Sequence, residues 1–178
     1  MLFQNGPLTV RLLEHKDQHL LAKWLSDPIV LEFYEGRDNS FDLEKVNQVF
    51  YTGEEDEVKC IIEFDDVEIG YIQYYLLDDD AKQNYGYQHQ KAYGMDQFIG
   101  EVSYWNKGIG TKLVASMVHH LFDQELADVV VMDPQIRNAR ALSCYEKCGF
   151  QKVKILPNHE LHEGEYQDCW LIEYRKKC

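Results

Sequence analysis

Residues 94–132 read GMDQFIGEVSYWNKGIGTKLVASMVHHLFDQELADVVVM, and this stretch decides the fold. Its beginning, Gly94 to Ile99, is strand-like. A glycine-containing turn leads into a run of helical period, whose apolar residues fall on one side: Ile109, Leu113, Met117, Leu121 and Phe122. The short apolar run Val129 to Met132 is typical of a strand buried on both faces. Strand, helix and strand at this spacing predict a βαβ unit, in which the two strands are parallel.

On the N-terminal side of this unit, the sequence predicts short strands and helices. Thr9 to Leu13 predicts a strand, and Asp17 is placed to cap a helix with the apolar face Leu20, Leu21, Trp24 and Leu25. We expect Asp27-Pro28 to end that helix, because the residue before proline disfavours helical backbone. The other elements expected here are a helix over Phe41 to Tyr51 and a hairpin of Val58 to Phe64 with Val67 to Leu77.

The rest of the chain predicts one long loop, one helix and two strands. Asp78 to Tyr93 is polar and rich in tyrosine without a period, so we expect a loop of the kind that often covers a site. Ala139 to Cys148 predicts a helix with Gly149 as its C-terminal cap. Gln151 to Leu156 and Cys169 to Tyr174 are expected to close the sheet. Since no linker, repeat or second core is visible, residues 1–178 are predicted to form a single domain.

The charge of the chain restricts its partners. Lys and Arg number 18 against 31 Asp and Glu, which gives a net charge of −13. Such a surface repels nucleic acid and anionic membranes and attracts cations, although acidity can also serve solubility alone. No run approaches the roughly 20 apolar residues of a membrane span, and Met1 to Val10 does not resemble a signal peptide. We therefore expect a cytoplasmic protein with no nucleic acid or membrane partner.

Cysteine and histidine residues predict no metal site. The cysteines are Cys60, Cys144, Cys148, Cys169 and Cys178, an odd number without a CxxC pair, which favours neither a disulfide framework nor zinc. Cys144 and Cys148 can share a helix face, and we expect two small buried side chains there. His159 and His162 are interpreted as surface residues rather than metal ligands.

Two motifs lie on the βαβ unit and the helix after it. The first is Trp105-Asn106-Lys107-Gly108-Ile109-Gly110-Thr111, where glycines allow close backbone approach and the helix N-terminus can hold a pyrophosphate. Neither a Rossmann fingerprint nor a P-loop fits, although the glycines could also serve only a tight turn. The second motif, residues 138–150, reads NARALSCYEKCGF and by itself is compatible with an ordinary amphipathic helix.

Taken together, the two motifs resemble the acetyl-CoA core of the GNAT acetyltransferase superfamily. The family pattern Asn-x-x-Ala-x-x-x-Tyr-x-x-x-Gly-Phe is matched by Asn138, Ala141, Tyr145, Gly149 and Phe150. Gly108 and Gly110 match the pyrophosphate turn, whereas Trp105 stands where Gln or Arg is usual. The resemblance implies an α/β (α+β) fold with a mixed, mostly antiparallel sheet, a central pair of splayed parallel strands and flanking helices.

A closer resemblance extends over nearly the whole chain, to the aminoglycoside 6′-N-acetyltransferases, including the acetyltransferase half of bifunctional acetyltransferase–phosphotransferase resistance enzymes. It rests on short segments spread along the sequence: residues 30–34 (VLEFY), 69–71 (IGY), 93–100 (YGMDQFIG), 132–134 (MDP) and 161–164 (LHEG). It implies acetyl transfer from acetyl-CoA to the 6′-amine of a cationic antibiotic, which would give resistance. The sequence ends at Cys178, so we expect no kinase half.

The resemblance also implies roles for individual residues. Asp96 is expected to act as the base for the acceptor amine or to orient it, and Tyr145 to protonate the leaving thiolate. The cofactor would be held by Gln97, Phe98, Ile99, Asn106, Lys107, Gly108, Ile109, Gly110, Thr111, Asn138, Ala141 and Tyr145. The acceptor would meet Asp96, Asp133, Glu163, Phe33 and Tyr34. Asp133 is the leading carboxylate, since it follows the carboxyl end of a parallel strand, although a plain Asp-Pro turn is the alternative.

Other functions are compatible with the same motifs. The acceptor could be a polyamine or a protein amine, in which case the cofactor site would be the same and the acidic pattern would differ. A non-catalytic CoA-binding domain is a further alternative, against which the presence of Asp96 and Tyr145 argues. For the assembly we expect a monomer or a homodimer.

Overall fold

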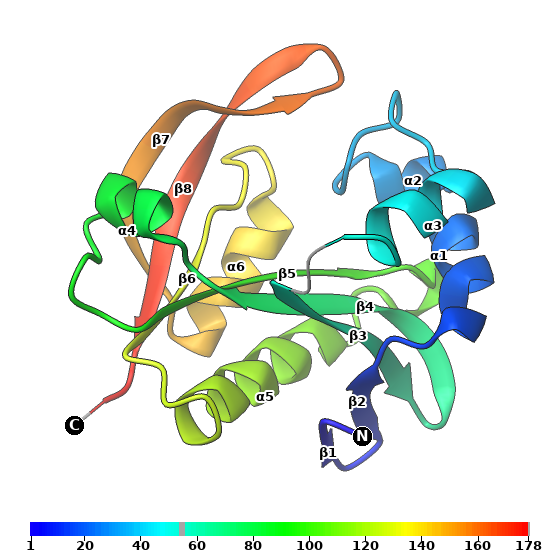
Figure 1. Ribbon diagram of the computed structural model, residues 1–178, viewed down its shortest axis with the longest axis horizontal. Helices are drawn as coiled ribbons and strands as arrows, with labels where there is room; N and C mark the ends of the chain where they lie inside the picture. The colour runs from blue at the N-terminus through cyan, green and yellow to red at the C-terminus, as the bar shows by residue number, and fades with distance from the viewer. Residues whose placement is uncertain (54–55, 178) are drawn as a thin grey trace. The chain divides into compact units, whose positions relative to one another are not determined.

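The computed structural model describes residues 1–53 and 56–177 (Figure 1). Cys178 lies outside the described residues. The strands of the described chain form an eight-stranded sheet in the order β1-β2-β3-β4-β5-β6-β8-β7. The strands are β1 (Phe3–Asn5), β2 (Leu8–Leu12), β3 (Glu57–Phe64), β4 (Val67–Leu76), β5 (Ala92–Ile99), β6 (Val129–Met132), β7 (Gln151–His162) and β8 (Glu165–Arg175). The expected parallel pair is β5 with β6, while β1–β2, β2–β3, β6–β8 and β7–β8 are antiparallel. The predicted mixed, mostly antiparallel sheet is therefore confirmed.

The described chain divides into two compact units, neither of which is one continuous segment. The first unit comprises residues 1–73 and 97–107, and the second comprises residues 74–96 and the chain from Gly108 onward. Strands β4 and β5 each contribute residues to both units. That the chain behaves as a single domain stays a prediction.

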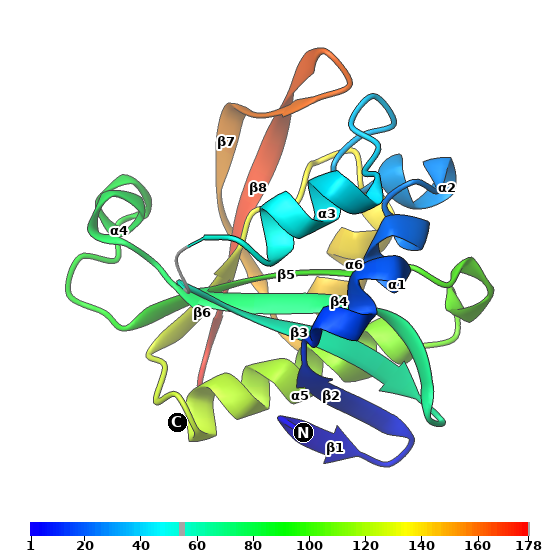
Figure 2. The same cartoon turned by 45° about the vertical axis from the view of Figure 1, so that its right-hand side comes forward.

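Helices cover the strands of the first unit. They are α1 (Gln18–Trp24), α2 (Pro28–Leu31) and α3 (Leu43–Phe50), which fall where helical periodicity was expected, with the exception of α2. Leu21, Trp24 and Val46 from the helices pack in one core with Ile61 and Tyr71 from the strands, and Figure 2 shows α1 and α3 beside β3 and β4. This burial of large apolar side chains is the main stabilising contribution that such a unit has.

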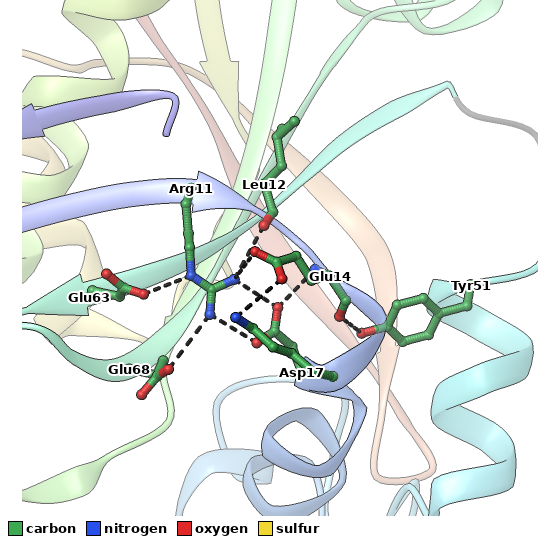
Figure 3. Close-up of polar contacts among 8 residues, drawn as sticks. Arg11, Leu12, Glu14, Asp17, Tyr51, Glu63 and Glu68 are labelled. Carbon is green, nitrogen blue, oxygen red and sulfur yellow. Dashed lines mark hydrogen bonds and ion pairs between the residues drawn. The ribbon is translucent and has the colours of Figure 1, made fainter.

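The predicted capping role of Asp17 is wrong. Asp17 precedes α1, but it belongs to a short 3-10 turn (His15–Asp17) with helical backbone, and its side chain makes no capping bond to α1. Its carboxylate instead accepts two hydrogen bonds from the Arg11 guanidinium, at 2.8 and 2.9 Å, as Figure 3 shows. The prediction that the first helix ends by Asp27-Pro28 is confirmed, since α1 ends at Trp24 and Asp27 has extended backbone. Pro28 also begins α2, because Asp27 caps its first turn and proline is favoured at the first helical position.

The second unit contains the remaining helices and the long C-terminal hairpin (Figure 1). Helix α5 (Ile109–Asp123) buries the predicted apolar face, and α6 (Ala139–Cys148) ends at Gly149 as expected. Gly149 has φ +107, and a Cβ there would lie 2.8 Å from the Tyr174 ring, so both conformation and space require glycine. Strands β7 and β8 are longer than the strands predicted for them, which were Gln151 to Leu156 and Cys169 to Tyr174.

The segment expected to be a loop, residues 78–93, contains a helix and the start of β5. Helix α4 (Asp79–Tyr85) begins where the Asp78 carboxylate accepts the Ala81 N–H at 2.7 Å and ends at Gly86, which has φ +89. Strong caps at both ends stabilise a helix too short and polar to show a period. Strand β5 begins at Ala92 rather than Gly94. None of the described helices has the length and hydropathy needed to cross a membrane.

Candidate active site

The turn that enters α5 presents a bare helix N-terminus. Gly108 is the N-cap residue, has φ +77, and makes no side-chain capping bond. Amide groups in the first turn of a helix have no intrahelical acceptor, and the helix dipole adds partial positive charge there. A Cβ built on Gly110 would meet only the Cys144 sulfur, at 3.7 Å. These features fit the pyrophosphate of acetyl-CoA, with the amides from Gly108 to Thr111 as the binding groups.

In the first unit, Trp105 fastens the end of β5. Its indole N–H donates to the Ile99 carbonyl oxygen at 2.8 Å, and its ring lies 6.2 Å from that of Phe33. A tryptophan at a position where the family usually has Gln or Arg thus makes a structural contact. Neighbouring Lys107 is exposed and places its ammonium 5.6 Å from the centre of the Tyr104 ring, so its charge is available at the surface. Asn106 is also exposed and has φ +60.

Strand β5 continues beyond its parallel partner. The last β5–β6 pair is Gly94 with Val131, whereas β5 runs on to Ile99. Gln97 and Ile99 are half-buried, and the Phe98 ring is buried against Trp24 and Tyr34. The described β5–β6 ladder thus ends before residues 97–99, and the pairing of a pantetheine arm with them stays a prediction.

Helix α6 supplies the second group of predicted cofactor residues. Asn138 is its N-cap, and the side-chain oxygen accepts the Ala141 N–H at 3.4 Å. This leaves the Nδ2 group of Asn138, the donor of the side-chain amide, pointing away from that capping bond as the group that would bind the pantetheine arm. Tyr145 is half-buried, with its ring 6.2 Å from that of Phe150. The roles of these residues toward acetyl-CoA stay predictions.

Two thiols connect α6 to the first turn of α5. The Thr111 hydroxyl and the Cys144 sulfur lie 3.5 Å apart, and the Cys148 thiol donates to the Thr111 carbonyl at 3.4 Å. The cysteines share a helix face as predicted, but both are half-buried rather than buried. Hydrogen bonding by the Cys148 thiol lowers the pKa of Cys144 to about 6, while that of Cys148 is raised.

Two predicted acceptor carboxylates, Asp96 and Asp133, raise the pKa values of the same two hydroxyl groups, those of Tyr75 and Tyr85. Burial raises the pKa of Tyr75 above its ordinary range, and the charges of Asp96 and Asp133 raise it further. Burial also raises the pKa of Tyr85, followed by the charge of Asp133 and, more weakly, that of Asp96. The second unit therefore gathers two carboxylates and two tyrosine hydroxyls into a negatively charged, hydrogen-bonding region suited to ammonium groups.

Asp133 has partners that the sequence did not indicate. Its Oδ2 lies 2.7 Å from His159 Nε2 and accepts a hydrogen bond from the Tyr85 hydroxyl at 3.4 Å. Tyr85 and His159 also contact each other, at 3.2 Å between Oη and Nε2. The interpretation as a surface residue is confirmed for His159, which is exposed although it pairs with Asp133, and is wrong for His162. His162 is only 4% exposed, and its Nε2 lies 2.6 Å from Arg137 Nη2.

The remaining acceptor candidates are Glu163 in the second unit and Phe33 and Tyr34 in the first. Glu163 stands with Gly164 in the turn between β7 and β8, where both residues have positive φ, +52 and +81. In the first unit, the Tyr34 ring lies 4.6 Å from that of Phe98, and Phe33 is 36% exposed. Phe33 and Tyr34 thus form an aromatic surface next to β5 and Trp105, as an apolar wall would require.

Comparison with known proteins identifies relatives of this architecture. The sequence model of the acetyltransferase (GNAT) domain matches residues 14–157. Aminoglycoside N(6′)-acetyltransferase type 1 from Klebsiella pneumoniae is 29% identical over 155 residues, which is 83% of this chain and 76% of that protein. The crystal structure of aminoglycoside acetyltransferase AAC(6′)-Ib with coenzyme A superimposes with a TM-score of 0.75 at 26% identity, covering 95% of each chain.

A more distant likeness shows the fold alone. Spermidine N-acetyltransferase from Vibrio cholerae, in complex with CoA and spermine, gives a TM-score of 0.79 at 16% identity, covering 96% of each chain. The family match spans most of the sequence, and the glycine turn and α6 have the geometry that the family motifs predict. The chain therefore belongs to the GNAT acetyltransferases, enzymes that use acetyl-CoA as acetyl donor.

Proposed function

We propose that the enzyme transfers the acetyl group of acetyl-CoA to the 6′-amine of aminoglycosides, and that this confers resistance to them. The observation that carries the proposal is the acidic region of the second unit, where Asp133 accepts a hydrogen bond from the Tyr85 hydroxyl at 3.4 Å and the charge of Asp96 acts on the same hydroxyl. An acceptor with several ammonium groups matches two neighbouring carboxylates better than a monoamine does. The relatives named for aminoglycosides, at 29% and 26% identity, support the same acceptor class.

The chemistry requires a bound thioester, an unprotonated amine and a thiolate that can leave. Acetyl-CoA supplies the thioester when bound at the α5 N-terminus and along residues 97–99. Asp96 receives or orients the amine proton, and Tyr145 donates a proton to the departing thiolate. Because a thiol has a pKa of about 8.5, the thiolate is a fair leaving group, and the contribution of Tyr145 to the rate is modest. The amine attacks the thioester directly in a ternary complex.

A CoA-release assay with an amine panel tests the proposal. Purified enzyme with acetyl-CoA would be offered kanamycin, spermidine, an N-terminal peptide or no amine, and the product position would be assigned by NMR. We expect release with kanamycin and acetylation at N6′. CoA release only with spermidine or the peptide would mean that the acceptor is a polyamine or a protein amine. No CoA release with any amine would favour a non-catalytic CoA-binding domain.

Asp96→Asn sharpens that assay. It should lower kcat strongly while CoA affinity, measured by calorimetry, is retained, because the change removes charge and basicity but keeps the shape. Asp123→Asn is the matched control, since Asp123 is a partly exposed carboxylate on α5 that pairs with His119. A rise in KM with unchanged kcat for Asp96→Asn would make Asp96 a binding residue.

A further inference from the structure

The cluster around Asp133 contains a histidine that carries a positive charge when it is protonated. Asp133 follows β6, Tyr85 ends α4, and His159 lies on β7, so three separate elements bring these groups together. The His159 and Asp133 side chains are 29% and 39% exposed, which leaves the pair accessible to a solute. A second contact between the same elements, Lys154 Nζ to the Asn84 carbonyl at 3.2 Å, fixes α4 against β7.

The charges around His159 favour its protonated form. The hydrogen bond to Asp133 raises its pKa and outweighs burial, which lowers it, and the charges of Asp133 and Glu160 raise it further. The Tyr85 hydroxyl also contacts the imidazole, at 3.2 Å from Nε2. The charge of Asp96 on β5 raises the pKa of that hydroxyl. On β8, the Cys169 thiol lies 3.9 Å from Glu160, and the Asp168 carboxylate accepts the Asn158 N–H at 2.8 Å. The charges that act on the imidazole are those of Asp133 and Glu160, and because both are acidic they stabilise the imidazolium.

An imidazolium on Asp133 competes with a substrate cation. A carboxylate oxygen that already accepts a charged N–H at 2.7 Å offers less to an ammonium group than the same oxygen beside neutral imidazole. The exchange replaces one charge-assisted hydrogen bond with another, so its free energy is small and its sign depends on pH.

We propose that His159 and Tyr85 belong to the acceptor subsite of Asp133, with His159 as an internal cation that an acceptor ammonium must displace. This deepens the proposed function and rests on it for the identity of the acceptor. Tyr85 holds the carboxylate and the imidazole from one side, which orients Asp133 whichever cation it binds. Acceptor affinity is then set by the protonation of His159, a residue that itself has no part in the acetyl transfer.

Kinetics over a pH series test the competition. For the parent enzyme, the KM for kanamycin should rise as the pH falls through the raised pKa of His159. In His159→Gln this rise should shrink by roughly threefold to tenfold at pH 6, the range expected for one partly exposed charged hydrogen bond. His119→Gln is the matched control, because His119 forms an exposed pair with Asp123 at 3.0 Å and should keep the parental profile. Its profile also accounts for titration of the amines themselves.

NMR of the His159 imidazole separates this inference from the proposed function. With CoA present and no acetyl donor, saturating kanamycin should lower the pKa of His159, and so should Asp133→Asn. Spermidine is titrated in parallel. Acetylation of kanamycin with an unchanged His159 pKa and parallel pH profiles would overturn the inference and leave the function intact. A shift with spermidine alone, without aminoglycoside acetylation, would uphold the subsite and overturn the function. No shift with either cation would overturn the subsite.

Discussion

Each unit contains a carboxylate held by a cationic side chain at nearly the same distance, yet the surroundings differ. In the first unit, Arg11 binds Asp17 through two hydrogen bonds, and the side chains are 13% and 2% exposed (Figure 3). In the second unit, His159 lies 2.7 Å from Asp133, and the side chains are 29% and 39% exposed. Distance alone therefore does not distinguish a pair that stabilises the fold from one available to a ligand.

The nature of the cation and the number of carboxylates complete the contrast. Arg11 stays charged at any accessible pH and also contacts Glu63 at 2.7 Å, with Glu14 and Glu68 at 3.8 and 3.7 Å. Burial alone would raise the pKa of Asp17, but hydrogen bonds from Arg11 and the Glu14 N–H hold it below its ordinary value. His159 can lose its charge near neutral pH. The first pair is permanent, and the second is exchangeable.

Asp17→Asn should produce the largest effect on stability. Removing one partner of a buried pair leaves an uncompensated charge, which typically costs about 3–5 kcal/mol. Because Glu63 still pairs with Arg11, we expect the lower end, about 3 kcal/mol less unfolding free energy. Urea denaturation measures this, with Asp123→Asn as the control. A loss below about 0.5 kcal/mol, the range of ordinary surface changes, would remove the distinction between the two pairs.

Asp133→Asn should leave the fold stable and weaken the acceptor. A carboxylate facing an ammonium group contributes about 1.5–3 kcal/mol through a charge-assisted hydrogen bond, or roughly a ten- to hundredfold rise in KM. The unfolding free energy should change by no more than about 1 kcal/mol, as for other exposed pairs. Steady-state kinetics with kanamycin and calorimetry with CoA check both halves. Weaker CoA binding by Asp133→Asn would mean that Asp133 belongs to the cofactor site and not to the acceptor site.

The pH dependence of stability should have opposite signs for the two pairs. The folded-state pKa of Asp17 is lowered, so its contribution is present above the ordinary pKa and lost as the pH falls through the folded value. The folded-state pKa of His159 is raised, so its contribution is complete below about 6.5 and lost as the pH rises through the folded value. The difference between parent and His159→Gln, below about 1 kcal/mol, should therefore disappear at alkaline pH in denaturation experiments.

Salt should also distinguish the two pairs, and we expect this to be the smallest of the predicted effects. Exposed charges are screened within a Debye length of about 8 Å at physiological ionic strength, whereas buried pairs are screened much less. The stability difference between the parent and Asp17→Asn should hardly change between low and high salt. The KM ratio of Asp133→Asn to the parent should decrease over the same range. Equal salt responses in denaturation and kinetics would contradict this assignment.

The sequence predicted the parts of the molecule with strong periodicity. Three local signals were sufficient: the helical spacing of apolar residues along α5, the four-residue apolar run of β6 and the glycine after α6. The structure places these elements as expected. Asp133 followed from its place after a buried parallel strand. Its cationic partner did not, because a pair formed between residues 26 positions apart leaves no local pattern.

The missed residues lie in segments where local signals were misleading. Tyr85 belongs to a seven-residue helix with little apolar character, so the stretch was interpreted as a loop. The strand was expected to end at Leu156, but β7 continues to His162, with a register shift between Leu156 and Glu160. This continuation is what brings His159 to Asp133.

Strand β7 also has a consequence for the solubility of the chain. It is the last strand of the described sheet and pairs only with β8 there, so its outer backbone edge offers hydrogen-bonding groups to another strand. Val153 and Ile155 are exposed on it, at 45% and 48%, a composition that favours edge-to-edge association. Lys154 places a positive charge between them, Lys152 places another directly before Val153, and Pro157 removes one backbone donor. Substitution of both lysines by threonine should therefore turn a tolerated edge into a nucleus for aggregation.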